Sequence, residues 1–174
     1  MLLAGDMGGT KTNLAVFAPD GGLAPVVETT FKSAAYPDLK ALLQQFLGGS
    51  DLSIDRVVLG VAGPVVQGQA AVTNLPWTVS ETILEEVLGI QEVKLINDLE
   101  ATAYGVPHLL PDDLYTLNDA SPRSGTKVVI APGTGLGEAV LLYQGGHYHV
   151  IPSEGGHADF APTNLFEIRL LRHL

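Results

Sequence analysis

Two glycine-rich turns carry the residues of this sequence that best suit phosphate chemistry. The first turn runs from Asp6 to Thr12 and has the sequence Asp-Met-Gly-Gly-Thr-Lys-Thr. Glycines let the backbone approach a ligand closely, and their N–H groups can point at phosphate oxygens. Threonine hydroxyls add donors, and a carboxylate at a strand end, here Asp6, can hold Mg²⁺ directly or through water. The predicted phosphate-binding residues beside Asp6 are Gly8, Gly9, Thr10, Lys11 and Thr12.

The Walker A motif fits this first turn poorly. Gly5, Lys11 and Thr12 have the spacing of a Walker A motif, but the motif is one residue short, because Thr10 stands where the second glycine belongs. A P-loop also opens a helix, whereas residues 13–17 (NLAVF) followed by Pro-Asp-Gly-Gly predict a strand and a hairpin reversal. An ordinary glycine-rich hairpin without a ligand remains the alternative interpretation.

The second turn, Gly133 to Gly137, resembles a dinucleotide fingerprint only loosely. Glu138 stands where the third fingerprint glycine belongs, and strands rather than a helix are predicted after it. A tight hairpin is again the alternative. Because both turns lie between two predicted strands, they are suited to clamp one polyphosphate from both sides of a cleft. In this second turn the phosphate-binding candidates are Gly133, Thr134 and Gly135.

Two pairs of polar residues follow predicted strands and could bind or activate a hydroxyl group. Asn97 and Asp98 come directly after an apolar run, where ligands of open α/β sheets bind. A carboxylate there can accept a proton from a substrate hydroxyl, although Asp98 could instead cap the helix that follows. Glu154 and His157 flank two glycines, so both side chains can approach one small polar ligand such as a sugar. A solvated polar turn is the alternative for this second pair.

The pair His147-x-His149 has the alternation that places two imidazoles on one face of a strand. No third or fourth ligand is evident beside it. Because structural metal sites need four ligands, we do not expect a metal ion there.

Hydrophobic periodicity and turn residues predict the elements that position these groups. A strand, a glycine turn and a strand occur twice, and prolines at positions 107 and 111 separate the two occurrences. We therefore expect a first α/β domain over residues 1–108 and the beginning of a second over residues 109–174. The predicted strands are 2–5, 13–17, 26–31, 56–61, 72–75, 93–96, 127–131, 139–143 and 147–151, and the predicted helices are 37–47, 80–88, 99–105 and 165–174.

Composition excludes several classes of protein. The 174 residues carry a formal net charge of −10, which repels nucleic acid and anionic membranes, so we expect neither as a partner. The absence of cysteine excludes disulfides, thiol nucleophiles and zinc fingers. No segment approaches the length of a membrane span, and Asp6 ends the first apolar run without a basic region before it. We expect a cytoplasmic protein.

Six motifs, taken together and in this order, resemble the bacterial ATP-dependent glucokinases, a family of the superfamily that contains sugar kinases, actin and heat-shock chaperones. The resemblance covers residues 4–162 and implies an α/β chain of the ribonuclease-H-like, actin-type ATPase fold. One small domain would be complete and the second would be cut short. The motifs are DMGGTKTNLAVF, GVAGPV, TNLPW, LINDLEATAYG, APGTGLGEAVL and PSEGGHADFAP.

The resemblance also implies roles for the candidate residues. Asp6 would lie near Mg²⁺, and the two glycine turns would face the phosphates of ATP. Asp98 would be the general base at the 6-hydroxyl of glucose. Asn97, Glu154 and His157 would bind the other parts of the sugar. The ligands implied are glucose and MgATP, and the complete enzyme would be a homodimer.

Members of this family are about twice as long as these 174 residues, so the resemblance covers the N-terminal half. We expect weak ligand binding and little or no turnover from this half alone. The alternative is a non-catalytic sugar-binding or assembly module derived from a hexose kinase. The presence of Asp98 favours the enzyme, because a module that only binds has no chemical need for a base.

Overall fold

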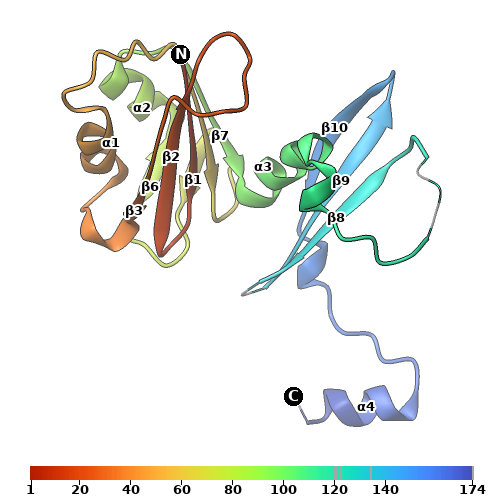
Figure 1. Ribbon diagram of the computed structural model, residues 1–174. Coiled ribbons are helices and arrows are strands. Elements are labelled where there is room, and N and C mark those ends of the chain that lie inside the picture. Colours follow the sequence, from red (N-terminus) through yellow and green to blue (C-terminus); the bar gives the residue numbers. More distant parts are fainter. Residues whose placement is uncertain (120, 122, 134, 174) are drawn as a thin grey trace. The chain divides into compact units, whose positions relative to one another are not determined.

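The computed structural model describes residues 1–119, 121, 123–133 and 135–173. It divides into two compact units, Met1–Tyr115 and Thr116–Leu174 (Figure 1). The domain boundary predicted after residue 108 stays a prediction.

The first unit contains a five-stranded sheet in the order β3-β2-β1-β4-β7. The first three strands pair antiparallel, whereas β4 and β7 run parallel to β1. A helix precedes each of β4 and β7, and such crossovers make parallel neighbours, as the sequence predicted for residues 56–61. The strands are β1 (Leu2–Met7), β2 (Lys11–Phe17), β3 (Val27–Lys32), β4 (Arg56–Val61) and β7 (Glu92–Asn97).

Alternation along the strands gives this sheet one buried and mainly apolar face. Helices α1 (Leu39–Leu47) and α2 (Glu81–Leu88) contribute to the core on that face, while α3 (Asp98–Gly105) lies against the other face (Figure 1). The carboxylate of Asp38 caps α1 and accepts a hydrogen bond from the N–H of Ala41 at 2.8 Å. The strand residues of the core are Leu3, Met7, Leu14, Val16, Val57, Leu59, Val61, Val93 and Leu95.

The strand predicted over residues 72–75 is wrong. The structure places strands on either side of it, β5 (Gln69–Ala71) and β6 (Thr78–Ser80), which form a two-stranded sheet. Residues 72–75 make the turn between them, in which Asn74 adopts a φ of 65°. Asparagine tolerates this left-handed conformation better than most residues. A residue in this conformation cannot continue a strand.

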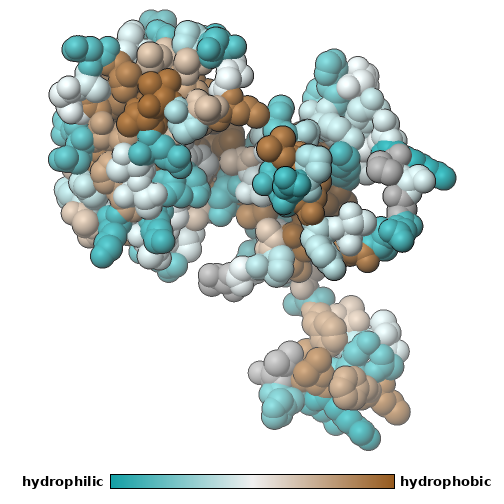
Figure 2. All heavy atoms as spheres, viewed as in Figure 1, coloured by the Kyte–Doolittle hydropathy of each residue, from teal (hydrophilic) through white to brown (hydrophobic). Residues whose placement is uncertain are grey.

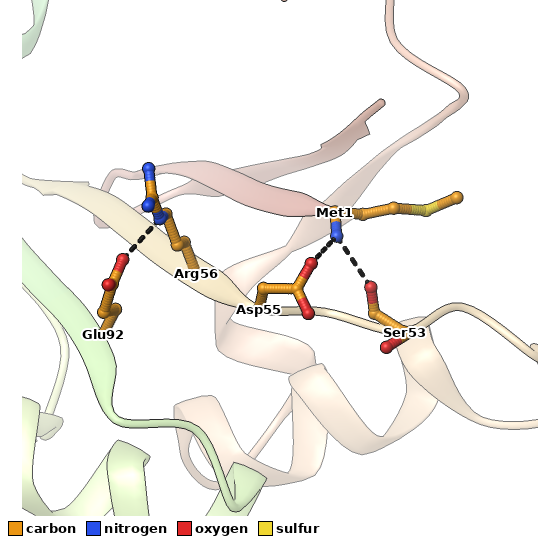
Figure 3. A network of polar contacts seen from close by, with 5 residues as sticks. All are labelled: Met1, Ser53, Asp55, Arg56 and Glu92. Atoms are coloured by element: carbon orange, nitrogen blue, oxygen red, sulfur yellow. Dashed lines mark hydrogen bonds and ion pairs between the residues drawn. The ribbon is translucent and has the colours of Figure 1, made fainter. Parts of the chain in front are cut away.

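Polar contacts hold the end of the sheet opposite to Asp6. The N-terminal ammonium of Met1 contacts the Asp55 carboxylate and donates a hydrogen bond to the carbonyl oxygen of Ser53 at 2.8 Å (Figure 3). Arg56 and Glu92, the first residues of β4 and β7, form an ion pair across neighbouring strands (Figure 3). These contacts are largely exposed, so each adds little to the stability of the sheet.

The second unit contains a three-stranded antiparallel sheet in the order β10-β9-β8, followed by helix α4. All three strands occur where the sequence predicted them. Hydrophobic side chains lie at the surface of α4 (Figure 2), where Leu165 is 75% and Phe166 is 76% exposed. No helix within the described residues is long and apolar enough to span a membrane. The bounds are β8 (Lys127–Pro132), β9 (Leu136–Gln144), β10 (His147–Ser153) and α4 (Leu165–Leu171).

Candidate functional site

Two carboxylates, Asp6 and Asp98, lie at the same edge of the five-stranded sheet. Strands β1, β4 and β7 run parallel, so their carboxyl ends meet at this edge. Asp6 pairs with Gly60 of the intervening strand β4, and Gly60 pairs with Ile96, two residues before Asp98. The two acidic residues therefore lie on either side of β4, at the edge where open α/β sheets bind ligands.

Gly60 lets helix α3 approach this edge closely. A Cβ atom at this position would lie 3.2 Å from the Cβ of Ala101 and 3.9 Å from the Cα of Asp98. Any side chain here would push α3, and Asp98 with it, away from the strand. Sequence reasoning missed this role, because no spacing of residues along the chain indicates which glycine faces a helix.

Asn97 is the N-cap of α3, and Asp98 is the first residue of the helix. The Oδ1 atom of Asn97 accepts hydrogen bonds from the N–H groups of Leu99 at 2.9 Å and Glu100 at 3.4 Å. Its Nδ2 donates to the carbonyl oxygen of Gly63 at 3.1 Å, which leaves one amide hydrogen for a ligand.

Asp98 also accepts a hydrogen bond at the start of α3, but Asn97 is the N-cap of the helix. The Oδ1 atom of Asp98 accepts from the N–H of Leu99 at 2.9 Å, and its Oδ2 atom has no hydrogen-bond partner among the described residues. The N-terminus of a helix also favours negative charge. Asp98 therefore has a carboxylate oxygen available to accept a hydrogen bond or a proton from a ligand.

The first glycine turn joins β1 to β2 in a hairpin, as predicted, and a strand follows it rather than the helix of a P-loop. The N–H of Gly8 donates to the carbonyl oxygen of Lys11 at 2.9 Å, and Thr10 and Lys11 are exposed. A Cβ on Gly9 would lie 2.5 Å from the carbonyl oxygen of Thr73, so only glycine allows this close approach.

Thr12 differs from the other candidates of this turn because its side chain is fully buried. Its hydroxyl lies 3.0 Å from the hydroxyl of Ser33, which follows β3. The sequence predicted donors from both threonines, but only the hydroxyl of Thr10 is on the surface of the turn.

A row of polar side chains crosses β1, β2 and β3 beside the turn. The Nδ2 of Asn13 donates to Asp6 at 3.4 Å, and the hydroxyl of Thr30 donates to the Oδ1 of Asn13 at 2.8 Å. Asp6 is exposed and presents hard carboxylate oxygens, the ligand type that Mg²⁺ prefers. Mg²⁺ is usually held by one or two carboxylates together with water and substrate phosphates, so Asp6 fits this ion in the presence of a nucleotide.

In the second unit, the second glycine turn and the turn from Glu154 to His157 lie at the same end of the sheet. The N–H of Gly133 donates to the carbonyl oxygen of Gly135 at 2.8 Å, and both glycines are exposed. A Cβ on Gly156 would collide with the carbonyl oxygen of Leu136, the first residue of β9. Thr134 lies outside the described residues.

The side chains of Glu154 and His157 come together on this turn. The Nε2 of His157 lies 3.5 Å from a carboxylate oxygen of Glu154, and both side chains are largely exposed. A Cβ on Gly155 would meet the carboxylate of Glu138, the end of a flexible side chain, so the backbone contact of Gly156 is the one that requires glycine for the turn to pack against β9. The pair is positioned to form hydrogen bonds with one small polar ligand.

His147 and His149 are both exposed on β10. Within residues 1–119, 121, 123–133 and 135–173, no group of three or more His, Cys, Asp or Glu side chains could hold a metal ion. A cation bound at Asp6 would therefore need ligands from water and from a substrate.

Comparison with known proteins identifies the relatives of this chain. A family model described as Glucokinase matches residues 3–174. The glucokinase of Nostoc punctiforme is 43% identical over 178 residues, covering 100% of this chain and 52% of the relative. The chain thus spans about half the length of the curated relatives it matches.

Two solved structures are similar over 98% of this chain. A glucokinase from an Antarctic psychrotroph has a TM-score of 0.84 at 29% identity, with 55% of that chain covered. A glucokinase from Balamuthia mandrillaris, solved in complex with glucose, has a TM-score of 0.72 at 25% identity, with 54% covered. These similarities confirm the actin-type α/β fold that the sequence motifs implied, and the chain belongs to the glucokinase family.

Proposed function

We propose that the protein containing this chain transfers the γ-phosphate of ATP to the 6-hydroxyl of glucose. The observation that carries this proposal is the pair Asp6 and Asp98, which flank Gly60 of β4 at one edge of the sheet. One carboxylate is available to a cation and the other to a substrate hydroxyl. The family supports the reaction, and the relative from Balamuthia mandrillaris is described as a complex with glucose.

Asp98 acts as the general base. It accepts the proton of the 6-hydroxyl while the sugar oxygen bonds to the γ-phosphorus and the bond from that phosphorus to the ADP oxygen breaks. Asn97 holds Asp98 through the cap of α3 and keeps one amide hydrogen for the sugar. Glu154 and His157 bind other sugar hydroxyls.

The two glycine turns bind the nucleotide phosphates. In the first turn, Gly8, Gly9, Thr10 and Lys11 offer backbone and side-chain donors, and Thr12 supports them from within the core. The second turn has the same role, through Gly133, Thr134 and Gly135. Asp6 would hold Mg²⁺, which would supply charge neutralisation at the phosphates. Catalysis rests on positioning and charge neutralisation, as phosphoryl transfer requires.

The test is glucose-dependent formation of ADP. Because the chain spans about half of its relatives, it is assayed alone and as a chimera that supplies the remaining half. In the chimera, residues 1–174 replace the corresponding segment of the Nostoc punctiforme glucokinase. We expect ADP and glucose 6-phosphate from the chimera and little or no product from the chain alone. A folded chimera that binds glucose but forms no product would instead favour a non-catalytic sugar-binding module.

A further inference from the structure

Ser33 is a buried polar residue that contacts the first glycine turn at three points. It follows β3, and none of its surface is exposed. Its Oγ donates to the carbonyl oxygen of Gly8 at 2.8 Å, and its N–H donates to the carbonyl oxygen of Thr10 at 3.1 Å. Its Oγ also lies 3.0 Å from the Oγ1 of Thr12. Three alternate residues of the turn are thus held by one serine.

The direction of these hydrogen bonds follows from the number of protons available. A serine hydroxyl has one proton, and here it is donated to Gly8. Its oxygen therefore acts as acceptor for the hydroxyl of Thr12, which is also fully buried. The result is a series of hydrogen bonds from Thr12 through Ser33 to the backbone of the turn, in which both hydroxyl-bearing side chains are fully buried.

This series of hydrogen bonds decides which way the peptide groups of the turn face. A peptide is planar and trans, so its C=O and the N–H of the next residue point in opposite directions. Because Ser33 draws the carbonyl of Gly8 inward, the N–H of Gly9 points away from the core. Among the described residues that N–H has no hydrogen-bond partner. It is therefore free to donate to an anion.

We propose that Ser33 is a positioning residue for the phosphate turn, because it fixes the peptide between Gly8 and Gly9 so that the N–H of Gly9 faces the nucleotide phosphates. This inference rests on the proposed function, which assigns the phosphate ligand to this turn. Ser33 touches no substrate in this account. It acts only through the backbone that it holds.

The test compares MgATP and glucose binding by the wild-type chain, that is, residues 1–174 joined to the remaining half as in the chimera described above, and by its Ser33→Ala variant, using amide NMR titrations. In the wild-type chain, MgATP shifts the amide signal of Gly9. In Ser33→Ala, we expect the dissociation constant for MgATP to rise by roughly fivefold to tenfold, the effect of losing a typical hydrogen bond. The dissociation constant for glucose stays within about twofold, because the sugar candidates lie outside this turn.

Ser50→Ala is the matched control. The hydroxyl of Ser50 also donates to a backbone carbonyl at 2.8 Å, but that carbonyl belongs to Leu47 at the end of α1. This variant should bind both ligands like the wild-type chain. If Ser33→Ala does not fold, Ser33→Cys replaces it, because a thiol fills nearly the same space and is a weaker donor.

The outcomes separate this inference from the proposed function. If MgATP leaves the amide of Gly9 in the wild-type chain unshifted at saturating concentration, the turn is not a phosphate site, and both proposals are overturned. If that amide shifts but the Ser33 variant binds MgATP as tightly as the wild-type chain, the positioning role alone is overturned. An equal loss of glucose and MgATP binding would also overturn it, since that indicates a general structural defect.

Discussion

At the scale of single residues, Gly60 decides how closely the helix that carries Asp98 approaches the sheet. A side chain on Gly60 would meet Ala101 of α3 at 3.2 Å, which is closer than most contacts of a Cβ atom, so α3 would have to shift. The catalytic proposal needs Asp98 at a fixed height above the strand ends. In that proposal Gly60 matters because it has no side chain, which lets α3 lie close to β4.

We predict that Gly60→Ala displaces α3 and lowers kcat of the chimeric enzyme by at least about tenfold, because small displacements of a catalytic group are costly. Overpacking should also lower the free energy of unfolding by about 1–3 kcal/mol. Steady-state assays and urea denaturation measure the two effects.

The control is Gly105→Ala in the same helix, where a Cβ meets nothing within 4 Å. That variant should be more stable by about 0.5–1 kcal/mol and fully active, and equal activities for both variants would contradict the account.

The sequence predicted the acidic residues of the site more readily than the residues that hold them. Asp6 and Asp98 follow apolar runs, and this pattern is visible along the chain. Ser33 and Gly60 have no such pattern, since their roles depend on what a neighbouring strand or helix brings next to them. Register and close packing are set by the folded sheet, so residues of this kind cannot be found from spacing.

At the scale of elements, the start of α3 depends on Asn97. Its side-chain oxygen satisfies two N–H groups of the first turn, and its amide ties the helix start to the carbonyl of Gly63. The position of Asp98 follows from this cap. Either residue could have been the cap from sequence alone, because asparagine and aspartate both suit that position.

Asn97→Ala should lower the free energy of unfolding of the chain by about 1 kcal/mol, the usual cost of removing an N-cap. Urea denaturation followed by circular dichroism measures it. Asn97→Asp is the matched variant, because it keeps a capping oxygen and replaces the donor to Gly63 with a second carboxylate oxygen. It should recover most of the lost stability. If Asn97→Ala is as stable as the wild-type chain, the assigned cap is wrong.

Helix α4 has its own pH-sensitive cap. The backbone N–H of Thr163 donates to Oε2 of Glu167 at 2.6 Å, its hydroxyl donates at 2.9 Å, and both lower the pKa of this carboxyl. A carboxyl whose pKa is lowered by folding stabilises the helix above its unfolded-state pKa, about 4.3 for glutamate. That contribution is lost as the pH falls through the lower, folded-state pKa.

We therefore predict that α4 frays on acidification below about pH 4.3, and that the effect comes from Glu167. Amide NMR signals of residues 165–171 monitor the helix during the titration. In Glu167→Gln the same signals should report a helix end that is already less ordered at neutral pH and changes little on acidification. A wild-type helix whose signals are independent of pH in this range would contradict the prediction.

Most elements could be predicted from periodicity, and the one wrong strand has a clear cause. Residues 72–75 are apolar enough to suggest a strand, but Asn74 turns the chain with a positive φ between two very short strands. Three-residue strands contain too few alternations to be recognised. By contrast, the repeated strand, glycine turn and strand could be predicted, because each strand is at least six residues long in the structure.

At the scale of the whole molecule, the two compact units differ in how much core they contain. The core cluster of the first unit includes residues from α1, α2 and the five-stranded sheet, all before the division at Tyr115. Among the described residues of the second unit, the fully buried hydrophobic side chains are those of Ala139 and Leu141. The first unit therefore has the larger share of the hydrophobic stabilisation.

We predict that residues 1–115 fold alone with a cooperative thermal transition, whereas residues 116–174 alone do not. Circular dichroism and the dispersion of amide NMR signals compare the two pieces with the complete chain under identical conditions. An unfolded first piece would contradict the account, and so would a cooperatively folded second piece.

The central claim is that Asp98 is a general base in phosphoryl transfer, and its most direct test is the substitution Asp98→Asn in the chimeric enzyme. We predict that kcat falls by about 10²–10⁴-fold, the usual contribution of general base catalysis, while the dissociation constant for glucose changes by no more than about threefold. The amide keeps the shape of the side chain and one acceptor oxygen, but it cannot take the proton. An Asp98→Asn enzyme that transfers phosphate at the unsubstituted rate would contradict the account.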